Sequence, residues 1–312
     1  MNKYSLNSSL QRKLTILLYH GVTDQKNSGI RNYQGKHLAK EEFYHQMDFV
    51  NKFCSPLSID DWVNIRNQPN EIPDFPTIIS FDDGFKNNLE IAAPILDNFS
   101  IPSIFYISSG MIDSHEMFWV DKIEDCIESS AKNNITIYLD SPEKFSLNSF
   151  DNKIKALLQI KSFCKLAPNS TKNAIIDELS EQTGVIPCKD NQKNYQTLSW
   201  NDLKILNENV LFTIGGHTHS HSIMSSLEDD ELNKEISECM ESLALNLTMQ
   251  VKHFSYPEGQ LHHFNAKVIA LLKEKGIICC PSAVNGINEF TEDLFTLKRV
   301  MVGFEGTAFP HE

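Results

Sequence analysis

Residues 77–84 read Thr-Ile-Ile-Ser-Phe-Asp-Asp-Gly, a largely apolar run that ends at two adjacent carboxylates and a glycine. A run this short, bounded by a turn signal, predicts a buried β-strand. In parallel α/β proteins, ligands bind at the carboxyl ends of the strands. Asp82 and Asp83 therefore occupy the place where a functional site is expected, and Gly84 permits a tight turn after them.

Strand-like runs alternate with helical patterns along the chain, which predicts an α/β fold with a parallel sheet or barrel. The other strand-like runs are residues 14–19, 103–107, 210–214, 253–256 and 276–281. The helical patterns cover residues 41–53, 88–98, 200–206, 229–247 and 264–275, the third with an N-cap signal at Ser199. Residues 121–197 break the alternation with a mostly helix-like, Lys/Asn/Ser-rich segment. We expect a single catalytic domain over residues 1–312 with a helical insertion at about 121–197.

Composition limits the function classes. The 312 residues are 41% hydrophobic and carry a net charge of −13, which argues against nucleic acid or an anionic membrane as a partner. A transmembrane helix needs about 20 apolar residues, and no such run is present. Residues 1–13 lack the apolar core of a signal peptide, and the seven cysteines have no regular spacing. We therefore expect a cytoplasmic protein with reduced cysteines, and the oligomeric state stays open.

A second polar cluster follows the strand-like run at residues 210–214. It reads Gly-Gly-His-Thr-His-Ser-His and contains His217, His219 and His221. Helical spacing would place His217 and His221 on one face and His219 elsewhere, so we expect His219 to be structural. One carboxylate with two imidazoles makes a facial metal site with open positions. Of two adjacent carboxylates, one can bind the metal while the other accepts a proton, which favours metal-assisted hydrolysis.

These motifs resemble those of the polysaccharide deacetylases of carbohydrate esterase family 4. The family's Thr-Phe-Asp-Asp-Gly motif is similar to residues 80–84, and its His-Ser/Thr-x-x-His motif is similar to residues 217–221. A third family motif looks like residues 254–259. The resemblance covers roughly residues 14–120 and 198–302, which leaves the insertion outside it.

The resemblance implies a distorted (β/α) barrel with fewer than eight regular repeats. It implies a divalent ion held by Asp83, His217 and His221, most simply zinc, with cobalt or nickel as alternatives. It also implies Asp82 as the base that activates water, and the backbone N–H of Glu258 as a donor to the oxyanion. The implied reaction removes an N-acetyl group from an acetamido sugar or glycan and releases acetate.

Departures from the family pattern concern the groups that assist Asp82. Ser255 stands where the family often carries an Arg that orients the base. Arg299 fits either a replacement that pairs with Asp82 or an ordinary surface Arg. The late Leu-His motif that supplies the general acid is absent, and His311 lies in the terminal tail. We expect His20 to replace it, because a His of near-neutral pKa can protonate the leaving amine. A structural or substrate-binding role for His20 stays open.

Two further side chains allow two interpretations each. Glu258 stands where the family usually has Tyr, and its carboxylate fits either an amino-bearing substrate or a solvent-facing position. Trp119 fits either core packing or an aromatic platform for a sugar ring. Two alternatives to a sugar deacetylase also remain: a metal-dependent amidase acting on a non-sugar C–N bond, and a catalytically silent carbohydrate-binding homologue. Acetate release from acetylated sugars discriminates among them.

Overall fold

The computed structural model describes residues 11–26 and 29–303, so His311 lies outside the described residues. The described residues form two compact units. The first unit comprises the described parts of Met1–Asp24, Gln34–Ser114 and Thr197–Glu312, and the second comprises those of Gln25–Tyr33 and His115–Gln196.

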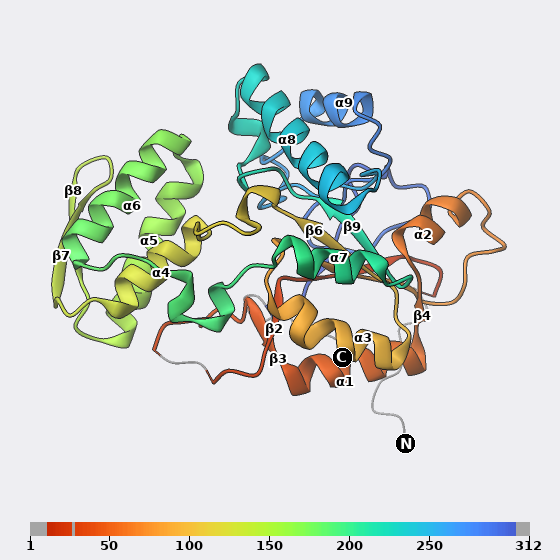
Figure 1. Cartoon of the computed structure of the whole chain (residues 1–312), viewed down its shortest axis with the longest axis horizontal. Helices are drawn as coiled ribbons and strands as arrows, with labels where there is room; N and C mark the ends of the chain where they lie inside the picture. Colours follow the sequence, from red (N-terminus) through yellow and green to blue (C-terminus); the bar gives the residue numbers. More distant parts are fainter. Residues whose placement is uncertain (1–10, 27–28, 304–312) are drawn as a thin grey trace. The chain divides into compact units, whose positions relative to one another are not determined.

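The first unit is built around a parallel sheet with the strand order β10-β1-β5-β6-β9, in which β4 also pairs with β5. Figure 1 labels β4, β6 and β9 of this sheet. These strands are β1 (Thr15–Tyr19), β4 (Ser55–Pro56), β5 (Pro76–Phe81), β6 (Ser103–Ile107), β9 (Phe212–Gly216) and β10 (Val300–Met301). A small parallel pair, β2 (Gly21–Thr23) and β3 (His37–Ala39), follows β1. Every residue of β5 is buried, as expected for a strand of a parallel sheet that is covered on both faces.

Beyond β9 the sheet continues as isolated bridges and returns to its first edge. Parallel bridges join Gly216 to Phe254 and His253 to Cys279. The following segments are linked by the backbone hydrogen bonds Cys280 N to Leu294 O (2.9 Å), Ser282 N to Leu297 O (2.8 Å) and Arg299 N to Val284 O (3.0 Å). Hydrogen bonds therefore run around an irregular ring from β10 to β9 and back. The predicted α/β fold with a distorted barrel is confirmed, although residues 253–256 and 276–281 form single bridges rather than regular strands.

Helices alternate with these strands, as the sequence pattern predicts. They are α1 (Lys40–Phe53), α2 (Ile59–Ile65), α3 (Ala93–Phe99), α7 (Trp200–Glu208), α8 (Asp229–Leu247) and α9 (Ala266–Glu274), with a π-helical turn η2 (Asn88–Ala92) and 3-10 turns η3 (Ser109–Met111) and η6 (Met224–Ser226). The predicted N-cap at Ser199 is present, because its side chain accepts a hydrogen bond from the backbone of Asp202 in a capping box.

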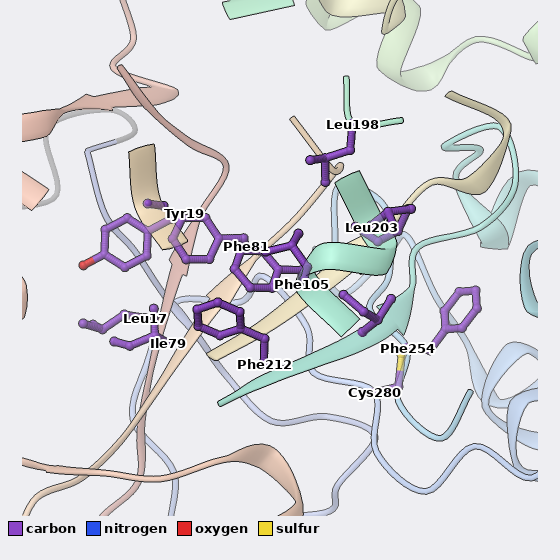
Figure 2. Close-up of a cluster of buried hydrophobic side chains, with 14 of the residues drawn as sticks. Leu17, Tyr19, Ile79, Phe81, Phe105, Leu198, Leu203, Phe212, Phe254 and Cys280 are labelled. Carbon is purple, nitrogen blue, oxygen red and sulfur yellow. The ribbon is translucent and has the colours of Figure 1, made fainter. Parts of the chain in front are cut away.

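A row of aromatic rings, labelled Tyr19, Phe81, Phe105 and Phe212, crosses the sheet (Figure 2). The centroids of Tyr19 and Phe81 lie 5.4 Å apart, those of Phe81 and Phe105 5.0 Å, and those of Phe105 and Phe212 5.4 Å. Each ring comes from a neighbouring strand, and such pairs contribute about 0.5–1.5 kcal/mol each beyond their burial. Because Phe81 immediately precedes Asp82, this packing fixes the end of β5 where the two carboxylates begin.

Gly216, the last residue of β9, has no room for a side chain. A Cβ there would lie 2.3 Å from Cε2 of Phe254 and 3.2 Å from Sγ of Cys239. We expect Gly216→Ala to lower the free energy of unfolding by about 1–3 kcal/mol, because the ring of Phe254 must move. Urea unfolding of the metal-free protein measures this, with Val210→Ala as the control because that side chain is 99% exposed. Equal transition midpoints for the two variants would contradict the expectation.

The second unit has a core of its own. It contains α4 (Trp119–Ser129), α5 (Phe150–Leu166), α6 (Asn169–Thr183), an antiparallel pair of β7 (Asn134–Tyr138) and β8 (Pro142–Ser146), and the 3-10 turns η4 (Lys189–Asn191) and η5 (Lys193–Tyr195). Residues such as Ile123, Leu157 and Leu179 are fully buried in this core. Arg31 joins this core through an ion pair of 2.6 Å with the buried Asp125. The helices agree with the expected helical insertion, whereas composition did not indicate the strand pair.

Candidate metal centre

Asp82 and Asp83 reach one site because the backbone changes conformation between them. Alternation along β5 places Ser80 and Asp82 on the same face of the sheet, and Arg299 contacts both side chains. Asp83 leaves this alternation with a left-handed φ of 77°, and Gly84 continues the turn with a φ of 93°. Asp is among the residues that tolerate this region. Both carboxylates are almost completely buried, at 3% and 5% exposure.

His217 and His221 converge on Asp83, but not through a helix. Oδ1 of Asp83 lies 3.5 Å from Nε2 of His217 and 3.2 Å from Nε2 of His221. The three ligand atoms all lie within 4.8 Å of one another. The residues after β9 are not helical, and Thr218 and His221 have left-handed φ values of 59° and 58°. The helical spacing suggested by the sequence was therefore wrong, and a tight loop brings the two rings together instead.

The donor set fits a divalent cation. Nδ1 of His217 lies 2.9 Å from the carbonyl oxygen of Ser255. When that nitrogen donates its proton to the carbonyl, the lone pair of Nε2 faces the carboxylate of Asp83. Oδ1 of Asp83 is buried and accepts no hydrogen bond within the described part of the chain. Two electron-pair donors that face one another in a buried site are stabilised by a cation between them.

Asp83 is held in the ionised form that a metal requires. Burial raises the pKa of Asp83, but the charge of His221 and contacts with both imidazoles outweigh it, so its pKa lies well below the ordinary value.

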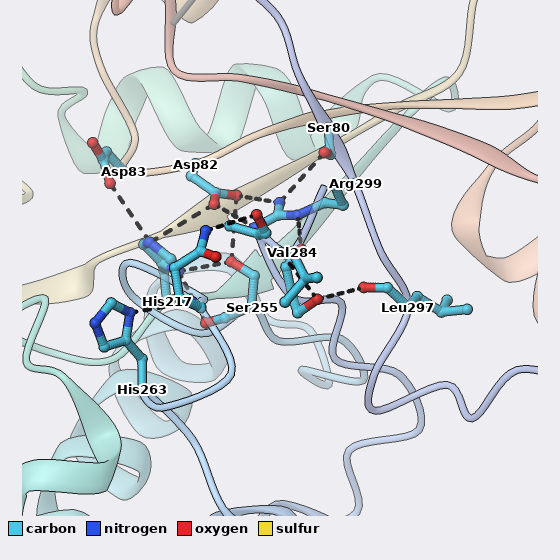
Figure 3. A network of polar contacts seen from close by, with 12 residues as sticks. Ser80, Asp82, Asp83, His217, Ser255, His263, Val284, Leu297 and Arg299 are labelled. Atoms are coloured by element: carbon cyan, nitrogen blue, oxygen red, sulfur yellow. Dashed lines mark hydrogen bonds and ion pairs between the residues drawn. The ribbon is translucent and has the colours of Figure 1, made fainter. Parts of the chain in front are cut away.

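Both terminal nitrogens of the Arg299 guanidinium contact the carboxylate of Asp82 (Figure 3). Nη1 lies 2.8 Å from Oδ1, Nη2 lies 2.7 Å from Oδ2, and Nε donates to the carbonyl of Ser282 at 2.7 Å. The Arg side chain is completely buried. Burial raises the pKa of Asp82, but the charges of Arg299 and His217 more than offset it, so the pKa lies below its ordinary value. Of the two interpretations of Arg299, the structure shows the pairing with Asp82.

Ser255 links the two halves of the site, which the sequence did not reveal. Its hydroxyl lies 2.7 Å from Nδ1 of His217 and 3.3 Å from Oδ1 of Asp82. From the family resemblance alone, position 255 could be described only as one where the usual Arg is missing. In the structure the small side chain leaves Arg299 as the partner of Asp82 and itself contacts the back of His217.

His20 follows β1 and lies close enough to Asp82 and Asp83 for their charges to affect its pKa. Burial lowers the pKa of His20, and Asp83 and Asp82 only partly counter this effect, so the ring is neutral at neutral pH. The adjoining Gly21 packs against a buried imidazole, because a Cβ there would lie 2.1 Å from Nδ1 of His37. That nitrogen also lies 2.9 Å from the amide nitrogen of Asn87. No sequence motif pointed to His37 or Asn87.

The remaining predicted residues are Glu258, His219 and Trp119. Glu258, three residues after Ser255, has a left-handed φ of 60°. The ring of His219 contacts Oγ of Ser109 at 2.9 Å, which agrees with a structural role. Trp119 is 8% exposed and packs in the core of the second unit, where Nζ of Lys172 lies 5.4 Å from its ring centroid. Core packing is therefore the interpretation that the structure supports for Trp119.

Solved structures with a similar fold include proteins described as deacetylases. The Streptococcus pyogenes deacetylase PplD in complex with acetate is 14% identical, with a TM-score of 0.62 over 95% of this chain and 94% of that chain. IcaB from Ammonifex degensii is 13% identical, with a TM-score of 0.58 over 93% and 92%. A de-N-acetylase from Aggregatibacter actinomycetemcomitans is 14% identical, with a TM-score of 0.58 over 95% and 97%. At these identities the likeness shows the fold alone.

Comparison with curated protein sequences gives no match. Within the described residues, no helix has the length and apolar character needed to cross a membrane. The sequence profile described as polysaccharide deacetylase matches residues 71–279, which is more than half of the chain and includes Asp82, Asp83, His217 and His221. This match, on a parallel barrel whose Asp and His side chains converge at one rim, shows that the chain belongs to the polysaccharide deacetylase family.

Proposed function

We propose that the protein is a metal-dependent hydrolase that removes an N-acetyl group from an acetamido sugar or glycan and releases acetate. The observation that carries the proposal is the buried group of Asp83, His217 and His221 beside a second, separately held carboxylate. These three residues would hold a divalent ion, which we propose to be zinc. When bound, such an ion supplies Lewis-acid polarisation of the amide carbonyl and lowers the pKa of water.

Asp82 is proposed to accept the proton of the attacking water. Arg299 and Ser255 fix its two oxygens, and the lowered pKa of Asp82, which results because Arg299 outweighs burial, keeps it ionised at neutral pH. We propose that the backbone N–H of Glu258 donates a hydrogen bond to the oxygen on which negative charge develops.

His20 is proposed to give the proton to the departing amine. Because the resting ring is neutral, it first takes up the proton that Asp82 removes from water. Burial lowers the pKa of His20, so the protonated ring then gives this proton up readily to the amine.

Replacement of His20 by Gln is expected to lower kcat by about 10²-fold, the lower end of the range for a general acid. KM and metal affinity should change little, because Gln keeps a polar side chain of similar length. Steady-state kinetics on an acetylated sugar with a good amine leaving group provide a sharper comparison, since such a substrate needs less protonation and should recover part of the rate. An equal loss on both substrates would argue for a structural role of His20.

Acetate release tests the proposal directly. The protein is treated with a chelator, reloaded with zinc, cobalt or nickel, and incubated with N-acetylated monosaccharides and oligosaccharides of increasing length. We expect release to disappear on chelation and return with metal. Absence of release from every sugar despite stoichiometric metal would overturn the proposal. A parallel panel of non-sugar acetamides then separates an amidase from a catalytically silent sugar-binding protein.

A further inference from the structure

The loop that carries His217 and His221 has a backbone that depends on its surroundings. Thr218 and His221 both adopt left-handed φ values, which are a genuine outlier for a β-branched residue such as Thr and uncommon for His. Such conformations persist only where neighbouring contacts impose them. The contacts around residues 217–221 therefore determine whether both imidazoles remain directed at Asp83.

The first half of this loop is held by the last residue of β6 and the residues that follow it. The N–H of His217 donates to the carbonyl of Ile107 at 2.9 Å, and the hydroxyl of Ser108 donates to the carbonyl of His217 at 2.9 Å. The N–H of Gly110 donates to the carbonyl of His219 at 2.8 Å. These bonds fix the path of the chain from residue 217 to residue 219, before it reaches His221.

The second half is held by one residue of α8. Oε2 of Glu235 accepts a hydrogen bond from the N–H of Ser220 at 2.8 Å, and Oε1 accepts one from its hydroxyl at 2.5 Å. The carbonyl of Glu235 also accepts the N–H of His219 at 3.2 Å. Beyond His221, the hydroxyl of Ser222 lies 2.7 Å from that of Ser220. Ser220, the residue immediately before His221, thus donates hydrogen bonds to both carboxylate oxygens of Glu235.

We propose that Glu235 is a positioning residue that acts through Ser220 to hold His221 in the geometry of a metal ligand, an inference that rests on the proposed metal-dependent function. Hydrogen bonds to a carboxylate are about twice as strong as neutral ones. Because Glu235 accepts two hydrogen bonds from Ser220, it fixes the orientation of that residue as well as its position. Without this side chain, Ser220 loses two acceptors and the left-handed turn at His221 loses its support.

Metal affinity is the quantity that tests this role. Four metal-free proteins are titrated with Co²⁺ and Zn²⁺ in competition with a chromophoric chelator: wild type, Glu235→Ala, Glu235→Gln and Ser220→Ala. The absorption spectrum of bound Co²⁺ is recorded for each. Loss of a residue that orients a metal ligand typically costs about 10–100-fold in metal affinity, and we expect this for Glu235→Ala together with a changed Co²⁺ spectrum. Glu235→Gln should lose less, because its amide oxygen can still accept the N–H of Ser220.

Glu238→Gln is the matched control. Glu238 lies on the same helix, its side chain is 42% exposed, and its carboxylate approaches His219 and Lys234 only at 3.9 and 3.8 Å. We expect wild-type metal affinity for this variant.

Three outcomes would overturn the proposal. The first is a Glu235→Ala protein with wild-type affinity and spectrum. The second is a variant whose metal-free form melts at a lower temperature but whose folded fraction binds metal normally, which indicates a merely structural role. If Glu235→Ala does not fold, unchanged affinity in both Glu235→Gln and Ser220→Ala is the third. Absence of metal binding by the wild type would instead defeat the proposed function itself, so the two failures are distinguishable.

Discussion

Replacement of Asp82 by Asn is expected to lower the rate of acetate release by about 10²- to 10⁴-fold, the range for loss of a general base, while metal affinity stays close to that of the wild type. Asn has the shape of Asp and keeps one oxygen for the guanidinium of Arg299, but it cannot accept a proton. Asp83, His217 and His221 remain in place, so the loss should appear in kcat rather than in metal content.

Steady-state kinetics and metal analysis of the same preparation measure this effect. Asp60→Asn is a suitable control, because Asp60 is also a carboxylate paired with a buried partner, with its Oδ1 3.1 Å from Nε2 of His253. It belongs to α2 and has no proposed part in the reaction. A rate for Asp82→Asn within tenfold of that for Asp60→Asn, with equal metal content, would show that another group acts as the base.

Replacement of Arg299 by Met is expected to destabilise the fold by about 3–5 kcal/mol, the usual cost of removing one partner of a buried ion pair. The guanidinium is completely buried and makes two short contacts with Asp82 and one with the carbonyl of Ser282. Met fills much of the volume but leaves the carboxylate of Asp82 buried without its counter-charge. Urea unfolding of the metal-free variant at about pH 7 gives the free-energy difference.

Unfolding measured at lower pH and a double variant distinguish the charge effect of this ion pair from a simple loss of packing. The folded pKa of Asp82 is lowered, because Arg299 and His217 outweigh the opposing effect of burial. The stabilisation by the pair is therefore present above the unfolded pKa, about 3.9, and is lost as pH falls through the lower folded pKa. The difference in the free energy of unfolding between wild type and Arg299→Met should become smaller at acidic pH. The double variant with Asp82→Asn should be more stable than Arg299→Met alone, and an unchanged or larger deficit would contradict a charge effect.

The positions of the site residues along the sheet could be predicted from the sequence. Short apolar runs at residues 14–19, 77–81 and 103–107 correspond to β1, β5 and β6, because strands buried on both faces have few alternatives to continuous apolar sequence. Carboxyl ends of parallel strands share one rim, so His20 and the Asp pair could be placed near each other before any coordinates were known. Arg299 could be proposed as one possible partner of Asp82 because Ser255 stands where the family often carries the orienting Arg.

Features that depend on tertiary contacts could not be predicted in this way. The left-handed turns at Thr218 and His221 are imposed by hydrogen bonds from two other elements, whereas the spacing of the histidines alone suggested a helix. The bridging role of Ser255 depends on the approach of His217 and Asp82 across the barrel. In the second unit, β7 alternates exposed and buried residues over only five positions, a signal too short to stand out within a polar segment.

The closing segment of the barrel also sets the order in which the site can mature during synthesis. Asp82 and Arg299 are 217 residues apart, and ribosomes add about 5–20 residues per second. A nascent chain therefore carries its Asp pair for roughly 10–40 s, by that rate, before the guanidinium that neutralises Asp82 has been made. Docking of the segment that contains Arg299 against β1 both closes the ring and pairs the carboxylate of Asp82 with its counter-charge. Catalytic competence is in this sense a late event of biosynthesis, and incomplete chains are expected to lack an ordered base.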